Sequence, residues 1–124
     1  MKYLALDIGK RRTGAAFGDT SVGIPCPLLT IHHENINSLI RQTLVIIQER
    51  KIDHLIIGLP LLPSGRPGSQ VSFVKQCIKK LEEYGVSYSL IDERYTTPKN
   101  NKGGSDAYAA CGILETKFMK EKDI

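Results

Sequence analysis

An aspartate near the end of the first apolar run constrains the fold of this chain more than any other feature. Residues 3–8 have the composition and length of a buried strand, and Asp7 is the charged residue within them. An unpaired carboxylate in a protein interior costs several kcal/mol, so it is normally retained only beside a compensating partner. A divalent metal ion is one such partner. Asp7 therefore predicts a site at the end of a core strand, to which other carboxylates contribute.

The other apolar runs and periodic segments alternate along the chain without an internal repeat. Expected strands cover residues 3–8, 14–19, 28–31, 55–60 and 86–91. Apolar residues at helical spacing predict a first helix that begins at Asn35 or Asn37 and ends near Lys51. Similar stripes predict a second helix, which starts around Val71 and stops before Gly85, and a third that begins near Ser105.

This order of elements predicts an α/β fold with a five-stranded mixed sheet flanked by helices. The first three strands are expected to form an antiparallel meander, and right-handed crossovers should then place the fourth and fifth strands parallel to the first. The carboxyl ends of the parallel strands would share one edge, where ligands usually bind in such sheets. Asp7, the Pro- and Gly-rich loop 61–68, and Asp92-Glu93 are expected to meet there. At 124 residues, the chain is expected to be one domain, 1–124.

Asp106 is a further acidic candidate, at the expected start of the last helix. Ser105 could cap this helix while Asp106 complements the positive end of the helix dipole, which is a purely structural interpretation. In the functional interpretation, the helix brings Asp106 to Asp7, and a cation such as Mg²⁺ relieves the repulsion between the carboxylates.

Basic residues cluster next to Asp7. The formal net charge is +4, from 17 Lys and Arg against 13 Asp and Glu, which is compatible with a polyanionic partner without requiring one. Lys10, Arg11 and Arg12 crowd the turn after Asp7, and Arg66 and Arg94 lie in later loops. These residues are candidates for contacts to phosphate or, equally, ordinary solvated loop charges.

Composition argues against several other classes of protein. No apolar stretch approaches the length of a membrane span, and no signal-peptide pattern follows the N-terminus, so a cytoplasmic location is expected. The three cysteines, Cys26, Cys77 and Cys111, are far apart and are interpreted as small apolar fillers. The histidines show no ligand spacing, and His54 is interpreted as a residue that flanks a strand.

Four segments together resemble the signatures of the YqgF/RuvX family, in the same order along the chain. They are the runs at 7–19, 58–61, 92–97 and 105–110, which read DIGKRRTGAAFGD, GLPL, DERYTT and SDAYAA. The resemblance implies a ribonuclease-H-like fold and kinship with Holliday-junction resolvases. It also implies a metal-dependent nuclease that processes the 5′ end of pre-16S rRNA, with a junction-resolving DNA endonuclease as the alternative. A non-catalytic nucleic-acid-binding protein is the competing class.

Carried over by position, the resemblance places the family's acidic residues on Asp7, Glu93 and Asp106. These carboxylates would hold Mg²⁺ or Mn²⁺ for hydrolysis of a phosphodiester bond.

The basic residues would contact nucleic acid, with RNA favoured over DNA. Arg12 and Arg94 could contact the scissile or flanking phosphates, while Lys10, Arg11 and Arg66 add attraction. A structural role remains open for two of these arginines. Arg94 could pair with Asp92 or Glu93, and Arg12 with Asp19 across the first hairpin.

The chain departs from the family pattern between the acidic motif and the final aspartate. Only the eight residues 98–105 intervene, where relatives usually carry a further helix and a basic stretch. This contraction puts the substrate clamp in question, and two glycines at 103–104 allow Asp106 to approach without ensuring it. A monomer or a weak homodimer formed through an edge strand is expected.

Overall fold

The computed structural model describes residues 1–60, 69–92 and 106–122. Its elements follow in the order β1 (Lys2–Ile8), β2 (Arg12–Asp19), β3 (Cys26–His32), α1 (Ile36–Arg50), β4 (His54–Leu59), α2 (Ser69–Glu83), β5 (Tyr88–Asp92) and α3 (Asp106–Lys122).

The strands form one mixed sheet in the order β3-β2-β1-β4-β5. β2 pairs antiparallel with both β1 and β3, whereas β4 pairs parallel with both β1 and β5. The predicted meander followed by parallel strands is therefore confirmed. Because β1, β4 and β5 run in the same direction, their carboxyl ends share one edge of the sheet, and the β1–β2 turn lies at this edge.

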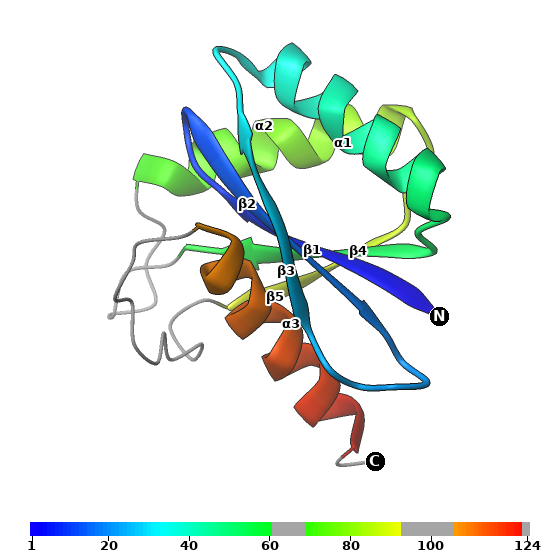
Figure 1. Cartoon of the computed structure of the whole chain (residues 1–124). Coiled ribbons are helices and arrows are strands. Elements are labelled where there is room, and N and C mark those ends of the chain that lie inside the picture. The colour runs from blue at the N-terminus through cyan, green and yellow to red at the C-terminus, as the bar shows by residue number, and fades with distance from the viewer. Residues whose placement is uncertain (61–68, 93–105, 123–124) are drawn as a thin grey trace.

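Helices cover both faces of the sheet (Figure 1). Leu4 and Leu6 of β1 belong to a core cluster with residues of α1 and α2, whereas Tyr3 and Ala5 belong to a second cluster with residues of α3. Successive side chains of a strand point to opposite faces. Asp7, two residues after Ala5, therefore faces the side that α3 covers.

Local sequence accounts for the ends of α1 and α2. The Asn35 side chain accepts a hydrogen bond of 2.8 Å from the backbone N–H of Ser38, which makes Asn35 the N-cap of α1. Lys51 ends the helix in the left-handed region, at φ 54°. Gly85 follows α2 with φ +73°, a conformation that glycine adopts without steric cost.

Helix α3 is tied to the sheet near its C-terminal end as well as its start. The Tyr3 hydroxyl donates a hydrogen bond of 2.5 Å to Glu121, and the Tyr3 and Phe118 rings stack with centroids 5.9 Å apart. Burial and the neighbouring Glu121 carboxylate raise the pKa of Tyr3 to about 12. The hydroxyl therefore stays protonated and keeps this bond at neutral pH.

The second, third and fifth strands differ most in extent from the prediction. β2 begins at Arg12, two residues earlier than expected. β3 begins at Cys26 and includes Pro27, because backbone pairing with β2 extends beyond the apolar run from which the strand was predicted. β3 is an edge strand, where proline is tolerated. β5 begins at Tyr88, two residues later than expected.

The cysteines and His54 test the remaining expectations about side chains. All three cysteines are free; Cys77 is buried and Cys111 partly so, and burial raises the pKa of both thiols to about 11. Cys26 is exposed at the start of the edge strand, so its interpretation as a buried filler was wrong. His54 is the first residue of β4, at the strand end as expected, with its Nε2 2.7 Å from the Ser89 hydroxyl.

None of the helices in the described ranges is both long and apolar enough to cross a bilayer.

Candidate functional site

Asp7 lies at the carboxyl end of β1, on the face of the sheet that α3 covers. Its partner across the antiparallel ladder is Gly14 of β2. The Asp7 side chain is partly exposed, so it reaches solvent at the sheet edge rather than the closed core. The predicted position of this carboxylate, at the end of a core strand, is confirmed.

Gly14 brings the start of α3 close to Asp7. A Cβ atom at Gly14 would lie 1.7 Å from the backbone oxygen of Asp106 and 2.1 Å from its carbonyl carbon. No side chain fits in this space, so only glycine lets the first turn of α3 lie against β2 at this position. Because Gly14 pairs with Asp7, α3 begins directly beside the strand that carries Asp7.

Asp7 and Asp106 line one cavity of about 330 Å³. The β1–β2 turn, residues 8–12, forms much of its wall, and Gln70 of α2 completes it. The structure therefore places two of the three predicted carboxylates at one cavity, together with Lys10, Arg11 and Arg12.

Arg12 pairs with Asp106 rather than with Asp19. Its Nε lies 3.5 Å from Oδ2 of Asp106, and its side chain remains 62% exposed. Asp19 lies at the far end of β2, where hydrogen bonds from the Ser21 backbone and hydroxyl lower its pKa. The expected alternative pairing of Arg12 with Asp19 was therefore wrong. An exposed ion pair of this kind contributes at most about 1 kcal/mol, which leaves the Arg12 guanidinium available to another anion.

Several predicted site residues lie outside the described residues. They are Glu93, Arg66 and Arg94, together with the loop 61–68 and the segment 98–105 that includes Ser105. Within residues 1–60, 69–92 and 106–122, no group of three or more His, Cys, Asp or Glu is arranged to hold a metal ion.

Asp92 does not complete such a group with Asp7, for a geometric reason. β4 separates β1 from β5, which puts the two strands roughly 10 Å apart. Ile91 packs in the cluster on the α3 face, so its neighbour Asp92 faces the opposite side of the sheet from Asp7. Glu93, the next residue in the sequence, lies outside the described residues.

A buried polar pair supports the β1–β2 turn, and the sequence analysis did not predict it. Thr13 Oγ1 and His33 Nε2 are 2.9 Å apart, and the backbone N–H of His33 donates to the Arg11 carbonyl at 3.0 Å. The His33 ring stacks on Phe73 of α2, and burial lowers the pKa of His33, which favours the neutral form of the ring. No spacing rule identifies this pair, because Thr13 lies in β2 and His33 directly follows β3, and the pairing of these two strands brings the residues together.

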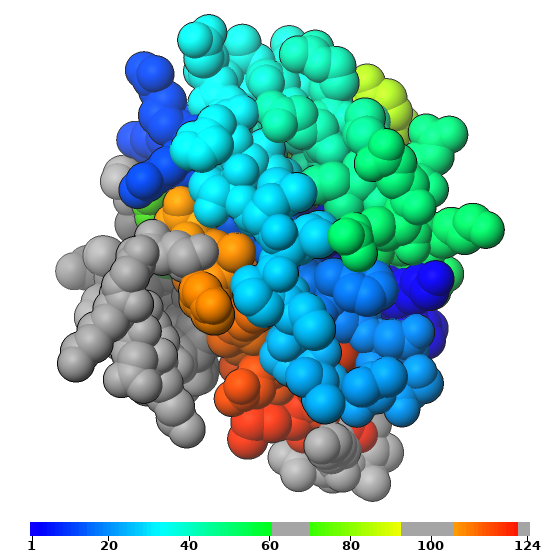
Figure 2. Space-filling model, viewed as in Figure 1, coloured from blue at the N-terminus to red at the C-terminus, as the bar shows by residue number. Residues whose placement is uncertain are grey.

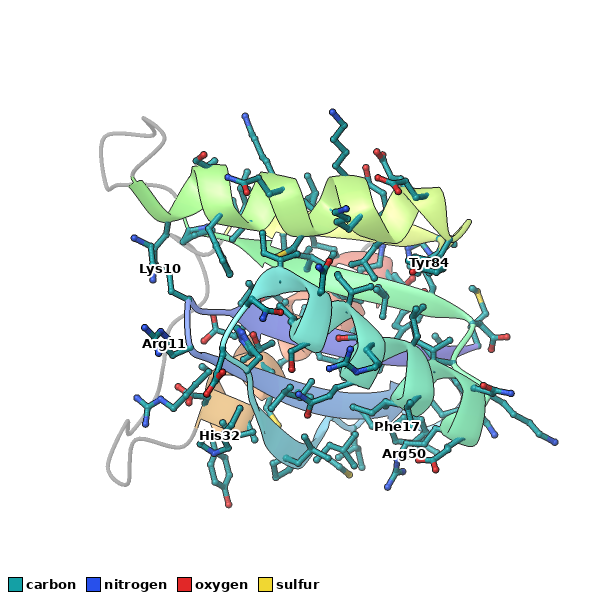
Figure 3. All side chains as sticks on the ribbon, turned by 90° about the horizontal axis from the view of Figure 1, so that it is seen from above. Lys10, Arg11, Phe17, His32, Arg50 and Tyr84 are labelled. Atoms are coloured by element: carbon teal, nitrogen blue, oxygen red, sulfur yellow. The ribbon has the colours of Figure 1, made fainter. Side chains whose placement is uncertain are left out.

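The basic residues of the turn gather at the same end of the sheet as the acidic pair. Figure 3 shows Lys10, Arg11 and His32 at this end, and Phe17 and Arg50 at the other. Arg50 lies over the Phe17 ring, 5.4 Å from its centroid, so that cation is engaged locally.

Solved structures share this arrangement of elements. Thermus thermophilus RuvC superposes with a TM-score of 0.68 and 11% identity, over 99% of this chain and 97% of that one. A Fowlpox virus resolvase, solved with Holliday junction DNA, superposes with a TM-score of 0.57 and 13% identity, over 98% and 99% of the two chains. At such identities the likeness concerns the fold, which is ribonuclease-H-like as predicted.

Sequence comparisons extend the likeness over nearly the whole chain. A protein of Roseiflexus sp. (strain RS-1) is 32% identical, covering 92% of this chain and 91% of its own length, and one of Rickettsia rickettsii is 32% identical, covering 98% and 88%. Both carry the name "Putative pre-16S rRNA nuclease". The family model described as RuvX, Holliday junction resolvase, matches residues 1–120. The chain therefore belongs to the RuvX family.

Proposed function

We propose that this protein is a metal-dependent nuclease that hydrolyses phosphodiester bonds in RNA, at the 5′ end of pre-16S rRNA. The observation that carries the proposal is the cavity that Asp7 and Asp106 line together with three basic residues. The names of the relatives supply the substrate. The protein would act in the cytoplasm, as a monomer or a weak homodimer.

The donor atoms at this cavity suit Mg²⁺ or Mn²⁺. Both ions favour hard oxygen ligands, and Asp7 and Asp106 present carboxylates at a partly open position. Two carboxylates in one cavity repel each other unless a cation lies between them. We propose that Glu93, the first residue after β5, is the third ligand.

The roles of the residues follow from this placement. A bound divalent ion would supply an activated water molecule and neutralise charge that develops on the leaving oxygen. Asp7, Glu93 and Asp106 would hold it at the sheet edge. Lys10, Arg11 and Arg12 would bind the phosphates of the substrate on one side of the cavity, and we propose that Arg66 and Arg94 add further phosphate contacts.

A second candidate activity is the resolution of Holliday junctions. The description of the family and the likeness to RuvC favour it. The same carboxylates would serve both reactions, because both break a phosphodiester bond. Cleavage assays with each substrate separate the two activities. A nuclease for rRNA cuts RNA spanning the 5′ end of 16S rRNA and leaves a four-way DNA junction intact.

The decisive experiment replaces single carboxylates by amides. Asp7→Asn and Asp106→Asn should each lower Mg²⁺- or Mn²⁺-dependent cleavage by about 100-fold or more, because a lost ligand removes several kcal/mol of transition-state stabilisation. Glu83→Gln, an equal change of charge at an exposed position on α2, is the matched control and should cut normally. Binding of RNA should survive in Asp7→Asn. Full cleavage by both aspartate variants would refute the proposal, and binding without cleavage by the unmodified protein would identify a non-catalytic binding protein.

A further inference from the structure

A second cavity adjoins the first and shares Arg11 and Arg12 with it. It has a volume of about 660 Å³, and its other walls come from the corner between β3 and α1, residues 32–35, and from Ser38 and Arg41 of α1. In Figure 2, the blue atoms of the β1–β2 turn lie against the cyan atoms of this corner and near the orange start of α3. The two cavities therefore form one continuous surface across the turn.

Positive charge dominates the second cavity. Arg11, Arg12 and Arg41 line it, and Glu34 is the single acidic residue among the described residues of its wall. Arg11 and Arg41 are exposed, and in the described part of the chain neither side chain has a hydrogen bond or ion pair. α1 also begins here without an acidic residue in its first turn, so the positive end of its dipole adds to the attraction for an anion.

Hydrogen bonds hold together the backbone segments that carry these cations. The Gln42 side chain of α1 donates to the His32 carbonyl of β3 at 2.9 Å. The His33 backbone N–H donates to the Arg11 carbonyl at 3.0 Å, and the buried Thr13 hydroxyl forms a hydrogen bond with the His33 ring. The turn that carries Arg11 is thus tied to the corner before α1, the helix that carries Arg41, so the backbone around the cavity is preorganised for a ligand.

We propose that this second cavity binds a backbone phosphate of the nucleic acid next to the phosphodiester that lies at Asp7 and Asp106. The inference rests on the proposed function for the position of the cut, whereas the anion site stands on Arg11 and Arg41. Nucleic acid fits better than an acidic peptide, because one phosphodiester would lie at Asp7 and Asp106, as the proposed function requires, while a neighbouring phosphate of the same backbone fills the second cavity. The strand would cross the β1–β2 turn over Arg11 and Arg12 and continue to the beginning of α1.

Salt dependence of binding tests the site without relying on cleavage. Fluorescein-labelled single-stranded RNA is titrated with Asp7→Asn protein between low and moderate salt, and with the same protein carrying Arg41→Gln. One lost phosphate contact should reduce the slope of log affinity against log salt by about 0.7, the value for a single-stranded nucleic acid. Lys79→Gln, which removes one exposed charge from α2, is the matched control and should leave the slope unchanged. An equal slope for Arg41→Gln and Lys79→Gln would overturn the proposal.

Shortening the RNA locates the site relative to the cut. As nucleotides are removed from one end, the difference between Arg41→Gln and the parent should vanish at a definite length, whereas removal from the other end should leave it. A difference that persists at every length would show a general charge effect and overturn the assignment. If Asp7→Asn still cuts normally while Arg41→Gln lowers the slope, the proposed active site is wrong and the phosphate site stands. Saturable competition by a polyglutamate peptide would assign the cavity to an acidic protein instead.

Discussion

Gly14 sets how closely α3, which begins at Asp106, approaches the strand that carries Asp7. Asp7 is its partner in the sheet, and the backbone of Asp106 occupies the space where any larger residue would place its Cβ. A polar site built on elements so far apart in sequence depends on this contact. The glycine therefore acts through the position of α3 rather than through a group of its own.

Gly14→Ala should displace the start of α3 and with it the Asp106 carboxylate. The Cβ would meet backbone atoms, which cannot rotate away, so we expect a loss of unfolding free energy of about 1–3 kcal/mol. We also expect metal-dependent cleavage to require a higher concentration of Mg²⁺ or Mn²⁺. Urea unfolding and metal titration of the cleavage rate measure the two effects.

Gly18→Ala is the matched control for this substitution. Gly18 lies on the same face of β2 and under the same helix, but its Cβ would meet the side-chain ends of Phe118 and Leu114, 2.8–2.9 Å away. These side chains can shift, and they lie far from the acidic pair. Gly18→Ala should lower stability without changing the metal requirement. An unchanged metal requirement in Gly14→Ala would contradict the positioning role.

Among the helices, α1 contributes its N-terminal end to the second cavity. Asn35 fixes where this helix begins, because its side chain accepts from the Ser38 N–H and so satisfies a donor that the helix itself leaves open. Asn35 and Ser38, which form this cap, also line the second cavity beside Arg11 and Arg12.

Asn35→Ala should lower the free energy of unfolding by about 1 kcal/mol, through loss of this cap. Asn35→Ser, which keeps a capping oxygen, should recover most of the loss. Chemical unfolding of the three proteins measures the difference. Equal stability of the alanine and asparagine proteins would show that the cap contributes nothing, and the start of α1 would then depend on packing alone.

For the whole molecule, we propose that residues 1–124 form one domain, since core clusters on both faces of a single sheet join all the described elements. Stability should then respond as one unit to the ionisation of a buried group. His33 is 4% exposed, and within the described residues its Nδ1 has no hydrogen-bond partner.

Unfolding free energy should fall as the pH drops below about 6.5. Burial, and secondarily His32, lower the pKa of His33 in the folded protein, so below the ordinary histidine pKa of about 6.5 the unfolded chain binds more protons than the folded one. The contribution of neutral His33 to the unfolding free energy is therefore complete above this pH. It is lost as the pH falls towards the pKa of His33 in the folded protein, by at most ~1.4 kcal/mol per pH unit.

Urea unfolding between pH 8 and pH 5 measures this dependence, in a single transition if the chain is one domain. His33→Gln should flatten the dependence, while His54, whose pKa burial also lowers, would leave a remaining slope. His32→Gln, a substitution at an exposed neighbour, should keep most of the pH dependence, because burial is the main cause of the lowered pKa of His33. An identical pH profile for His33→Gln and the parent would rule out this role for His33.

Patterns within short stretches were enough to predict much of the architecture. Apolar runs alternating with apolar residues at helical spacing predicted the meander, the parallel strands and the three helices. This works because the residues that each element buries form a pattern within that element. The ends of the strands were predicted less well. β3 extends back to Cys26 and Pro27 because its bounds depend on pairing with β2, which hydrophobicity does not record.

The sequence by itself determined that Asp7 lies near the end of a core strand and that the basic turn follows it at once, because one short stretch of residues carries both features. Only the tertiary structure decided that Arg12 pairs with Asp106, that Thr13 and His33 support the turn, and that Arg41 joins the basic surface. The physical reason is that these contacts join residues on different elements. Their geometry arises from the stacking of helices on the sheet and from the missing side chain at Gly14, which no local pattern encodes.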